Sequence, residues 1–284
     1  MFGSRLCTVL ARSTVPERLP NGETARRPAR SVDVMATEHE LSTSFGRAAA
    51  TYEAGRPGYP DEAVAWLLAP VTTQAHHRPR VADVGAGTGK LTRTLVELGA
   101  EAVAVDPDAE MLGTLREHVP GVPTFVGTAE ALPLPDGVLD AVVLGQAWHW
   151  VDPDAGSAEL GRVLRAGGVL GLIWNIRDES VPWVARLTAI MRGSHAEMLL
   201  AAGDPPVRAP FDGLEERRWS WERPMTRASL TAMVLSRSYI ITASADERER
   251  IDREIAALFD EVGAVGDAEV ALPYVTRAYR AVRP

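Results

Sequence analysis

The sequence predicts an α/β fold in which a doubly wound, mostly parallel sheet carries helices on both faces. The first observation is a unit made of a buried strand at 81–84, a glycine turn, a helix and a second strand at 102–106. The second is a pair of later segments, 139–145 and 169–174, whose unbroken apolar character is typical of parallel strands covered on both faces. Helical segments alternate with these strands, which favours crossover connections and a parallel sheet.

Composition favours one main domain and a small-molecule partner. The chain has 284 residues, of which 46% are hydrophobic, enough for one large core. The net charge of −8 provides no basic surface for nucleic acid, and no apolar run is long enough to cross a membrane. The single cysteine, Cys7, leaves no disulfide framework and no CxxC metal site, which fits a cytoplasmic protein. We expect a monomer or a homodimer.

The chain begins with a segment that has no core-forming pattern. Residues 1–34 are rich in arginine and proline and lack apolar periodicity, so we interpret them as a disordered tail or as an extension upstream of Met35. The main domain is then expected over 35–284. It starts with a helix from residue 44 that breaks at Gly55, and a second helix follows over 62–68.

The glycine turn after the first strand indicates a nucleotide site. Glycines at 85, 87 and 89 allow a tight turn and leave no Cβ between the main chain and a ligand. A phosphate-binding P-loop is excluded, because it needs a glycine five residues before Gly89 and a Ser or Thr after Lys90. The dinucleotide fingerprint requires a third glycine at the position of Lys90, so an NAD-dependent oxidoreductase is disfavoured.

An acid follows at the end of the second strand. Leucines at 91, 95 and 98 predict a crossover helix that ends at Gly99, and the next strand ends at Asp106. A carboxylate about 20 residues after the glycine turn accepts hydrogen bonds from ribose hydroxyls in nucleotide-binding βαβ units. The alternative is that Asp106 serves as the N-cap of the following helix.

The motif Asp83-x-Gly85-x-Gly87-x-Gly89, followed by Asp106, resembles the first motif of the class I S-adenosylmethionine-dependent methyltransferases. The resemblance implies S-adenosylmethionine as cofactor, a small-molecule acceptor and a Rossmann-like sheet of seven strands with an antiparallel last strand. A cofactor-binding scaffold without catalytic activity stays an alternative.

Three further segments extend the resemblance. The pattern Tyr52-x-x-x-Arg56-Pro-x-Tyr59-Pro is similar to a leader that forms lid helices over 44–68 and turns Arg56 toward the methionine carboxylate of the cofactor; alternatively, the tyrosines pack and Arg56 is a helix-end cation. The loop from Gly127 to Pro133 resembles one that contacts adenine, although relatives commonly carry Asp where Thr128 stands. A helix cap at Thr128 is the other interpretation.

The fourth strand brings Gln146, Trp148, His149 and Trp150 to the same edge of the sheet. The His-Trp pair is common at this point of the family, and His149 is the candidate general base. The alternatives are core packing for both tryptophans and a structural hydrogen bond for His149. The expected cofactor-binding residues are Tyr52, Arg56, Asp83, Gly85, Ala86, Gly87, Asp106, Pro107, Met111, Thr128, Ala129, Glu130 and Gln146.

The last third of the chain contains no sharp motif. Residues 179–215 are expected to form a cap insertion with an amphipathic helix around 184–191. A strand at 216–221, helices at 226–241 and 245–262, and a final alternating strand at 271–282 complete the predicted sheet. No metal site is expected, since the adjacent residues His76 and His77 have no third ligand nearby.

Overall fold

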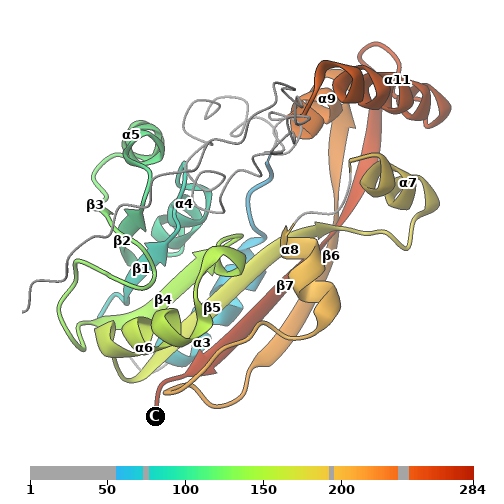
Figure 1. Ribbon diagram of the computed structural model, residues 1–284. Helices are drawn as coiled ribbons and strands as arrows, with labels where there is room; N and C mark the ends of the chain where they lie inside the picture. Colours follow the sequence, from blue (N-terminus) through green and yellow to red (C-terminus); the bar gives the residue numbers. More distant parts are fainter. Residues whose placement is uncertain (1–55, 73–76, 192–194, 236–242) are drawn as a thin grey trace, which may run out of the picture. The chain divides into compact units, whose positions relative to one another are not determined.

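The computed structural model describes residues 56–72, 77–191, 195–235 and 243–284 (Figure 1). The described residues belong to one compact unit. Tyr52, the first expected lid helix, residues 1–34 and His76 lie outside the described residues, so their predicted roles stay predictions.

The described chain forms one seven-stranded sheet in the order β3-β2-β1-β4-β5-β7-β6. Strands β1 to β5 pair in parallel, and β7 runs antiparallel to both of its neighbours, β5 and β6. This confirms the predicted doubly wound, mostly parallel sheet with an antiparallel last strand. The strands are β1 (Arg80–Val84), β2 (Glu101–Asp106), β3 (Thr124–Val126), β4 (Leu139–Gly145), β5 (Leu164–Arg177), β6 (Glu215–Thr226) and β7 (Glu269–Val282).

Helices cover both faces of the sheet, and different apolar clusters fill the two faces. On one face lie α3 (Asp61–Thr72), α4 (Lys90–Glu97) and α5 (Ala109–His118). On the other lie α6 (Pro153–Val163) and α8 (His195–Ala202). Because the strand order changes direction between β1 and β4, a crevice opens at the carboxyl ends of these two strands.

A further cluster of buried side chains lies beyond this three-layer arrangement. The strands β6 and β7 continue past the rest of the sheet, and α7 (Pro182–Met191), α9 (Arg227–Leu235) and α11 (Ala245–Glu261) gather around their far ends (Figure 1). Helix α7 falls within the segment expected to form a cap. It packs with α9 and α11, which lie between β6 and β7 in the sequence. This group of helices therefore comes from two segments of the chain, one before β6 and one after it.

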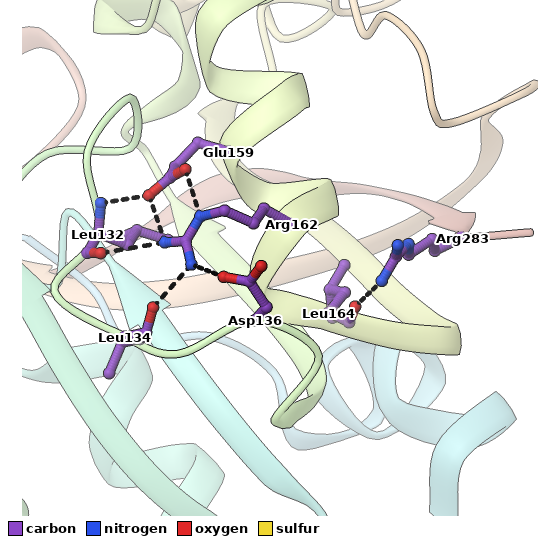
Figure 2. Close-up of polar contacts among 7 residues, drawn as sticks. All are labelled: Leu132, Leu134, Asp136, Glu159, Arg162, Leu164 and Arg283. Atoms are coloured by element: carbon purple, nitrogen blue, oxygen red, sulfur yellow. Dashed lines mark hydrogen bonds and ion pairs between the residues drawn. The ribbon is translucent and has the colours of Figure 1, made fainter.

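An arginine on α6 fixes the loop that follows β3 (Figure 2). The Arg162 guanidinium donates to the carbonyls of Leu132 and Leu134 at 3.2 and 2.9 Å, and it pairs with Glu159 and Asp136 at 2.7 and 2.5 Å. The Leu132 N–H donates to the same Glu159 carboxylate at 2.7 Å. The Arg162 guanidinium holds the pKa of Glu159 below its usual value. The loop predicted to contact adenine is thus tied to a helix on the sheet.

Candidate functional site

A pocket lies where the crevice meets the glycine turn. Its wall includes Arg56 from the leader, Gly85, Ala86 and Gly87 from the turn, and Gln146 after β4. Both glycines have left-handed φ, 71° for Gly85 and 54° for Gly87. A Cβ on Gly85 would come within 2.6 Å of the Ala147 side chain, whereas a Cβ on Gly87 would meet nothing within 4 Å. Glycine at 85 therefore allows close packing, and glycine at 87 leaves open space for a ligand.

Asp106 stands beside this turn at the end of β2. Its two carboxylate oxygens accept hydrogen bonds from the N–H groups of Gly87 and Asp108, each at 2.8 Å. Burial raises the pKa of Asp106, and the two N–H donors oppose that effect. The N-cap interpretation of Asp106 is wrong, because Asp108 caps α5 by accepting from the N–H groups of Glu110 and Met111. Asp106 therefore does not cap α5, and its carboxylate faces the glycine turn.

Asp83 lies beneath the turn and is fully buried on β1. One carboxylate oxygen accepts a hydrogen bond from the Thr92 hydroxyl of α4 at 2.6 Å, and the other has no hydrogen-bond partner among the described residues. Burial raises the pKa of Asp83 to about 7, the Thr92 hydroxyl counteracts this, and the charge of Asp106 adds to it. Asp83 does not line the pocket; in this structure it joins β1 to α4.

These residues fit the cofactor that the sequence predicts. The open space at Gly87 next to the Asp106 carboxylate suits a ribose, and Arg56 and Lys90 line the same pocket with positive charge that suits a carboxylate. Helix α4 begins directly after the turn, and its N-cap, Gly89, has no side chain to occupy the helix end. The arrangement can hold a nucleoside that also bears a charged amino acid group.

A second pocket adjoins the first at the carboxyl ends of β4 and β5. The two pockets share Arg56, Pro57 and Gln146. Gln146 is the one non-glycine residue with positive φ in the described part of the chain, at 56°, and its side-chain amide donates to the Asn175 carbonyl at 2.9 Å. Strain of this kind is characteristic of functional sites. The remaining wall of the second pocket consists of Asn175, Ile176, Ala196, Glu197, Met233 and Tyr274.

A buried ion pair supports the wall of this second pocket. Arg177 at the end of β5 has a 1% exposed side chain and donates to Glu197 of α8 at 2.7 Å. It also donates to the Thr188 hydroxyl of α7 at 3.1 Å. Removing one partner of such a pair leaves the other charge buried and is strongly destabilising. Arg177 therefore ties α7 and α8 to the sheet next to the pocket.

The leader is fastened to the sheet through Asn175. The Asn175 side chain donates to the Gly58 carbonyl at 2.8 Å and accepts from the Thr276 hydroxyl at 2.7 Å. Thr276 in turn accepts from the Trp221 indole at 2.8 Å. The relay joins β5, β7 and β6 to the segment that carries Arg56. Tyr59 packs against the end of β4, where a Cβ on Gly145 would lie 2.6 Å from its hydroxyl, and it also lines the pocket at the glycine turn.

Seven of the expected cofactor residues that the structure describes lie outside the pocket wall, namely Asp83 and Asp106, treated above, and five others. Pro107 and Met111 flank the start of α5, and Met111 is buried. Thr128 to Ala131 form a turn closed by a backbone bridge and start no helix, so the helix-cap interpretation is wrong. Ala129 is buried, and the Glu130 carboxylate accepts from the Asp152 N–H at 3.0 Å.

The Trp-His-Trp segment forms one short 3₁₀ turn, η2 (Trp148–Trp150). Trp148 is 1% exposed and belongs to the core cluster on the α6 side, as the packing interpretation expects. The rings of His149 and Trp150 lie 4.9 Å apart with a 43° tilt. Neither residue lines the two pockets described above, so the role of His149 stays a prediction.

Several residues in the wall of the second pocket were not predicted from the sequence. The sequence assigns no role to Asn175, and Glu197, Met233 and Tyr274 come from the part of the chain without motifs. The only available signal was the position of Asn175 directly after an apolar strand, where loops often carry function. The other three depend on how α8, α9 and β7 pack.

The described residues hold no helix long and apolar enough to cross a membrane. Within the same ranges, no group of three His, Cys, Asp or Glu side chains comes together as a metal site.

Comparison with known proteins identifies the family. A family model described as a methyltransferase domain matches residues 82–172. The uncharacterized methyltransferase Rv3342 of Mycobacterium tuberculosis is 43% identical over 251 residues, which cover 86% of this chain and 98% of that protein. An uncharacterized methyltransferase of Schizosaccharomyces pombe is 33% identical over 219 residues, 76% of this chain and 86% of that protein.

Solved structures agree on the fold. A protein from Anaeromyxobacter dehalogenans, described as a type II methyltransferase, aligns with a TM-score of 0.59 over 80% of this chain and 97% of its own at 23% identity. The extent and identity of the sequence matches, the glycine turn with its acid, and the strand order lead to one conclusion: the chain belongs to the class I S-adenosylmethionine-dependent methyltransferases.

Proposed function

We propose that this enzyme methylates a small-molecule acceptor by in-line displacement. The observation that carries the proposal is the pair of adjoining pockets, which share Arg56, Pro57 and Gln146. One pocket has the features expected of the cofactor site, and the other is narrow and lined by both apolar and polar side chains. Because the chain belongs to the methyltransferases, the alternative of an NAD-dependent oxidoreductase is dropped.

We assign these roles on the cofactor side. Asp106 receives the ribose hydroxyls, and the glycine turn lets the main chain approach the nucleoside. Arg56 neutralises the carboxylate of the amino acid part. The loop with Thr128, Ala129 and Glu130 borders the adenine. When bound, S-adenosylmethionine supplies a methyl group on a positively charged sulfur that is already a good leaving group.

The protein's task is then to align the acceptor with the methyl group and to exclude water. Gln146 lies between the two pockets in a fixed, strained conformation, so it is suited to separate cofactor from acceptor and to position both. Such alignment contributes several kcal/mol to lowering the barrier. For an acceptor that must lose a proton, we assign the general base to His149. The single cysteine and the net charge of −8 favour a cytoplasmic enzyme without a nucleic-acid substrate.

An acceptor screen with methyl-labelled S-adenosylmethionine tests the proposal. Label should pass to small molecules, and S-adenosylhomocysteine should form in the same amount. Transfer of label only to protein or nucleic acid in an extract, with no small-molecule product, would overturn the small-molecule assignment. Binding of the cofactor is measured separately by calorimetry.

A further inference from the structure

A third cavity opens beside the two pockets and differs from them in charge and size. It is a groove of about 510 Å³ between the leader, the start of α4 and strand β6, within the range of small-molecule sites. Arg56, Lys90 and Arg223 line it together with Tyr59 and Trp221. We propose that this groove binds an oxyanion of the acceptor, a carboxylate or a phosphate ester, at a distance from the atom that is methylated. The inference rests on the proposed small-molecule function.

Electrostatics favours an anion at this place. The three charged side chains that line the groove are all cations, and none of its described lining residues is acidic. The chain as a whole carries a net charge of −8, and Lys90 is its only lysine. Three cations gathered in one concave surface of an acidic protein raise the local concentration of anions and repel cationic ligands.

The groove adjoins the second pocket. Arg56 and Pro57 line both cavities. Trp221 of the groove stacks on Tyr274 of the second pocket, with ring centroids 4.9 Å apart and an interplanar angle of 15°. The second pocket itself offers only about 20 Å³, roughly the space of one water molecule. The reacting end of an acceptor can enter there, and the body of the molecule has to lie in the groove along the aromatic pair.

The three cations divide between cofactor and acceptor. Arg56 and Lys90 also line the pocket at the glycine turn, where they face the expected carboxylate of the cofactor. Arg223 lines only the groove among the three cavities. Its planar guanidinium can donate two parallel hydrogen bonds to a carboxylate or phosphate. Arg223 is therefore the residue that distinguishes an anionic acceptor from a neutral one.

The test is a transfer assay with methyl-labelled S-adenosylmethionine and acceptors in matched sets. Each hydroxy or amino scaffold is offered as a carboxylate, as a phosphate ester and as the neutral amide or alcohol. We expect turnover of an anionic member with a KM at least ~10-fold below that of its neutral partner. Arg223→Gln should raise the KM for the anionic member ~10- to 100-fold, the effect of losing hydrogen bonds between charged groups. The kcat and the cofactor affinity should stay within about 2-fold.

Matched controls separate the possible outcomes. Arg218→Gln removes the same charge from the same strand on its opposite face, and the KM for the anionic member should not change. Whichever oxyanion gives the lower KM identifies the ligand class. Preference for the neutral members, or equal effects of Arg223→Gln on both members, overturns the anion site and leaves the small-molecule function intact. Transfer of label to macromolecules alone overturns both the anion site and the small-molecule function. Calorimetric binding of S-adenosylmethionine then shows that the enzyme itself is intact.

Discussion

Two aspartates of the glycine-turn unit illustrate how the surroundings of a residue decide its role. Both carboxylates are buried, but Asp106 accepts from two backbone N–H groups and Asp83 from one hydroxyl. The second oxygen of Asp83 has no hydrogen-bond partner in the described chain. A buried carboxylate with so few donors is stabilised when it binds a proton. The motif predicts both acids from the sequence, but only the structure distinguishes Asp106, which accepts from the glycine turn, from Asp83, which supports α4.

The first residue-scale prediction concerns the pH dependence contributed by Asp83. Its pKa rises from about 3.8 to about 7 on folding because of burial, so the folded state holds a proton that the unfolded state releases. The stabilisation is complete below about pH 4 and is lost as the pH rises through 7. The linkage relation bounds this loss at roughly 4 kcal/mol. Asp83→Asn keeps an acceptor for Thr92 and removes the titration. Its melting temperature should exceed that of the wild type by a margin that grows from pH 5 to pH 8.

A margin that stays constant over this range would contradict the raised pKa of Asp83. The Thr92→Val variant serves as the companion measurement. It removes the hydroxyl that stabilises the charged form, so its destabilisation should be larger at pH 8 than at pH 5.

The second residue-scale prediction concerns His149. If it is the general base, His149→Ala should lower the methylation rate of an acceptor that must lose a proton by ~100-fold or more. Cofactor affinity should hardly change, because His149 does not line the cofactor pocket. The pH profile of the rate is the decisive measurement. If the variant loses the acidic limb of this profile, His149 acts as a base. A modest loss of rate that does not depend on pH means that His149 only shapes the pocket. Reduced folding stability without a separate effect on the rate indicates a structural hydrogen bond.

At the scale of elements, the sequence determined the parallel part of the sheet well. Strands β1, β2 and β4 appear within a residue or two of their predicted positions because parallel strands covered on both faces need unbroken apolar runs. Strand β6 was expected over 216–221 and extends over Glu215–Thr226. Its added residues pair with β7 and pack under α9 and α11. That extension depends on distant partners, which local periodicity does not reveal.

Helix α8 shows a second limit of sequence analysis. The stretch His195–Ala202 is apolar on more than one side and has no periodic polar face, so the pattern indicated no separate helix. Its place is determined by burial of Ala196 and Leu200 against the sheet and by the pair of Glu197 with Arg177. The same contacts bring Glu197 to the second pocket, which is why that wall could not be predicted.

The element-scale prediction concerns the arginine that holds the loop after β3 to α6 (Figure 2). Arg162→Lys keeps the charge and loses the planar fork that reaches two carbonyls and two carboxylates. Because the Arg162 side chain is 33% exposed, we expect a modest loss of about 1 to 2 kcal/mol in the free energy of unfolding. Urea unfolding measures this loss, and the Leu132 amide, which donates to Glu159, should exchange its hydrogen faster.

Arg253→Lys is the matched control for this substitution. Arg253 and Glu249 form an exposed pair at 3.3 Å, with side chains 70% and 71% exposed. Its replacement should change stability by less than about 0.5 kcal/mol. Equal losses in the two variants would mean that Arg162 acts only as a surface charge.

At the scale of the whole described unit, the glycine turn and the second pocket are supported by different clusters of buried side chains. Leu115 of α5 supports the glycine turn, since a methyl group on Gly89 would lie only 2.7 Å from its Cγ. Leu258 of α11 belongs to the cluster that contains Met233 and Tyr274, which line the second pocket. The long strands β5 and β7 connect the two regions. The two binding steps should therefore respond separately to packing defects.

The last prediction uses this separation. Leu115 and Leu258 are both fully buried, so Leu115→Ala and Leu258→Ala remove the same atoms, and each should lower the free energy of unfolding by roughly 2 to 5 kcal/mol. Leu115→Ala should weaken S-adenosylmethionine binding several-fold by calorimetry and leave the acceptor KM unchanged at saturating cofactor. Leu258→Ala should raise the acceptor KM and leave cofactor affinity unchanged. If each variant changed both constants to the same extent, the clusters would form one cooperative core, and a packing defect anywhere in it would reach both sites.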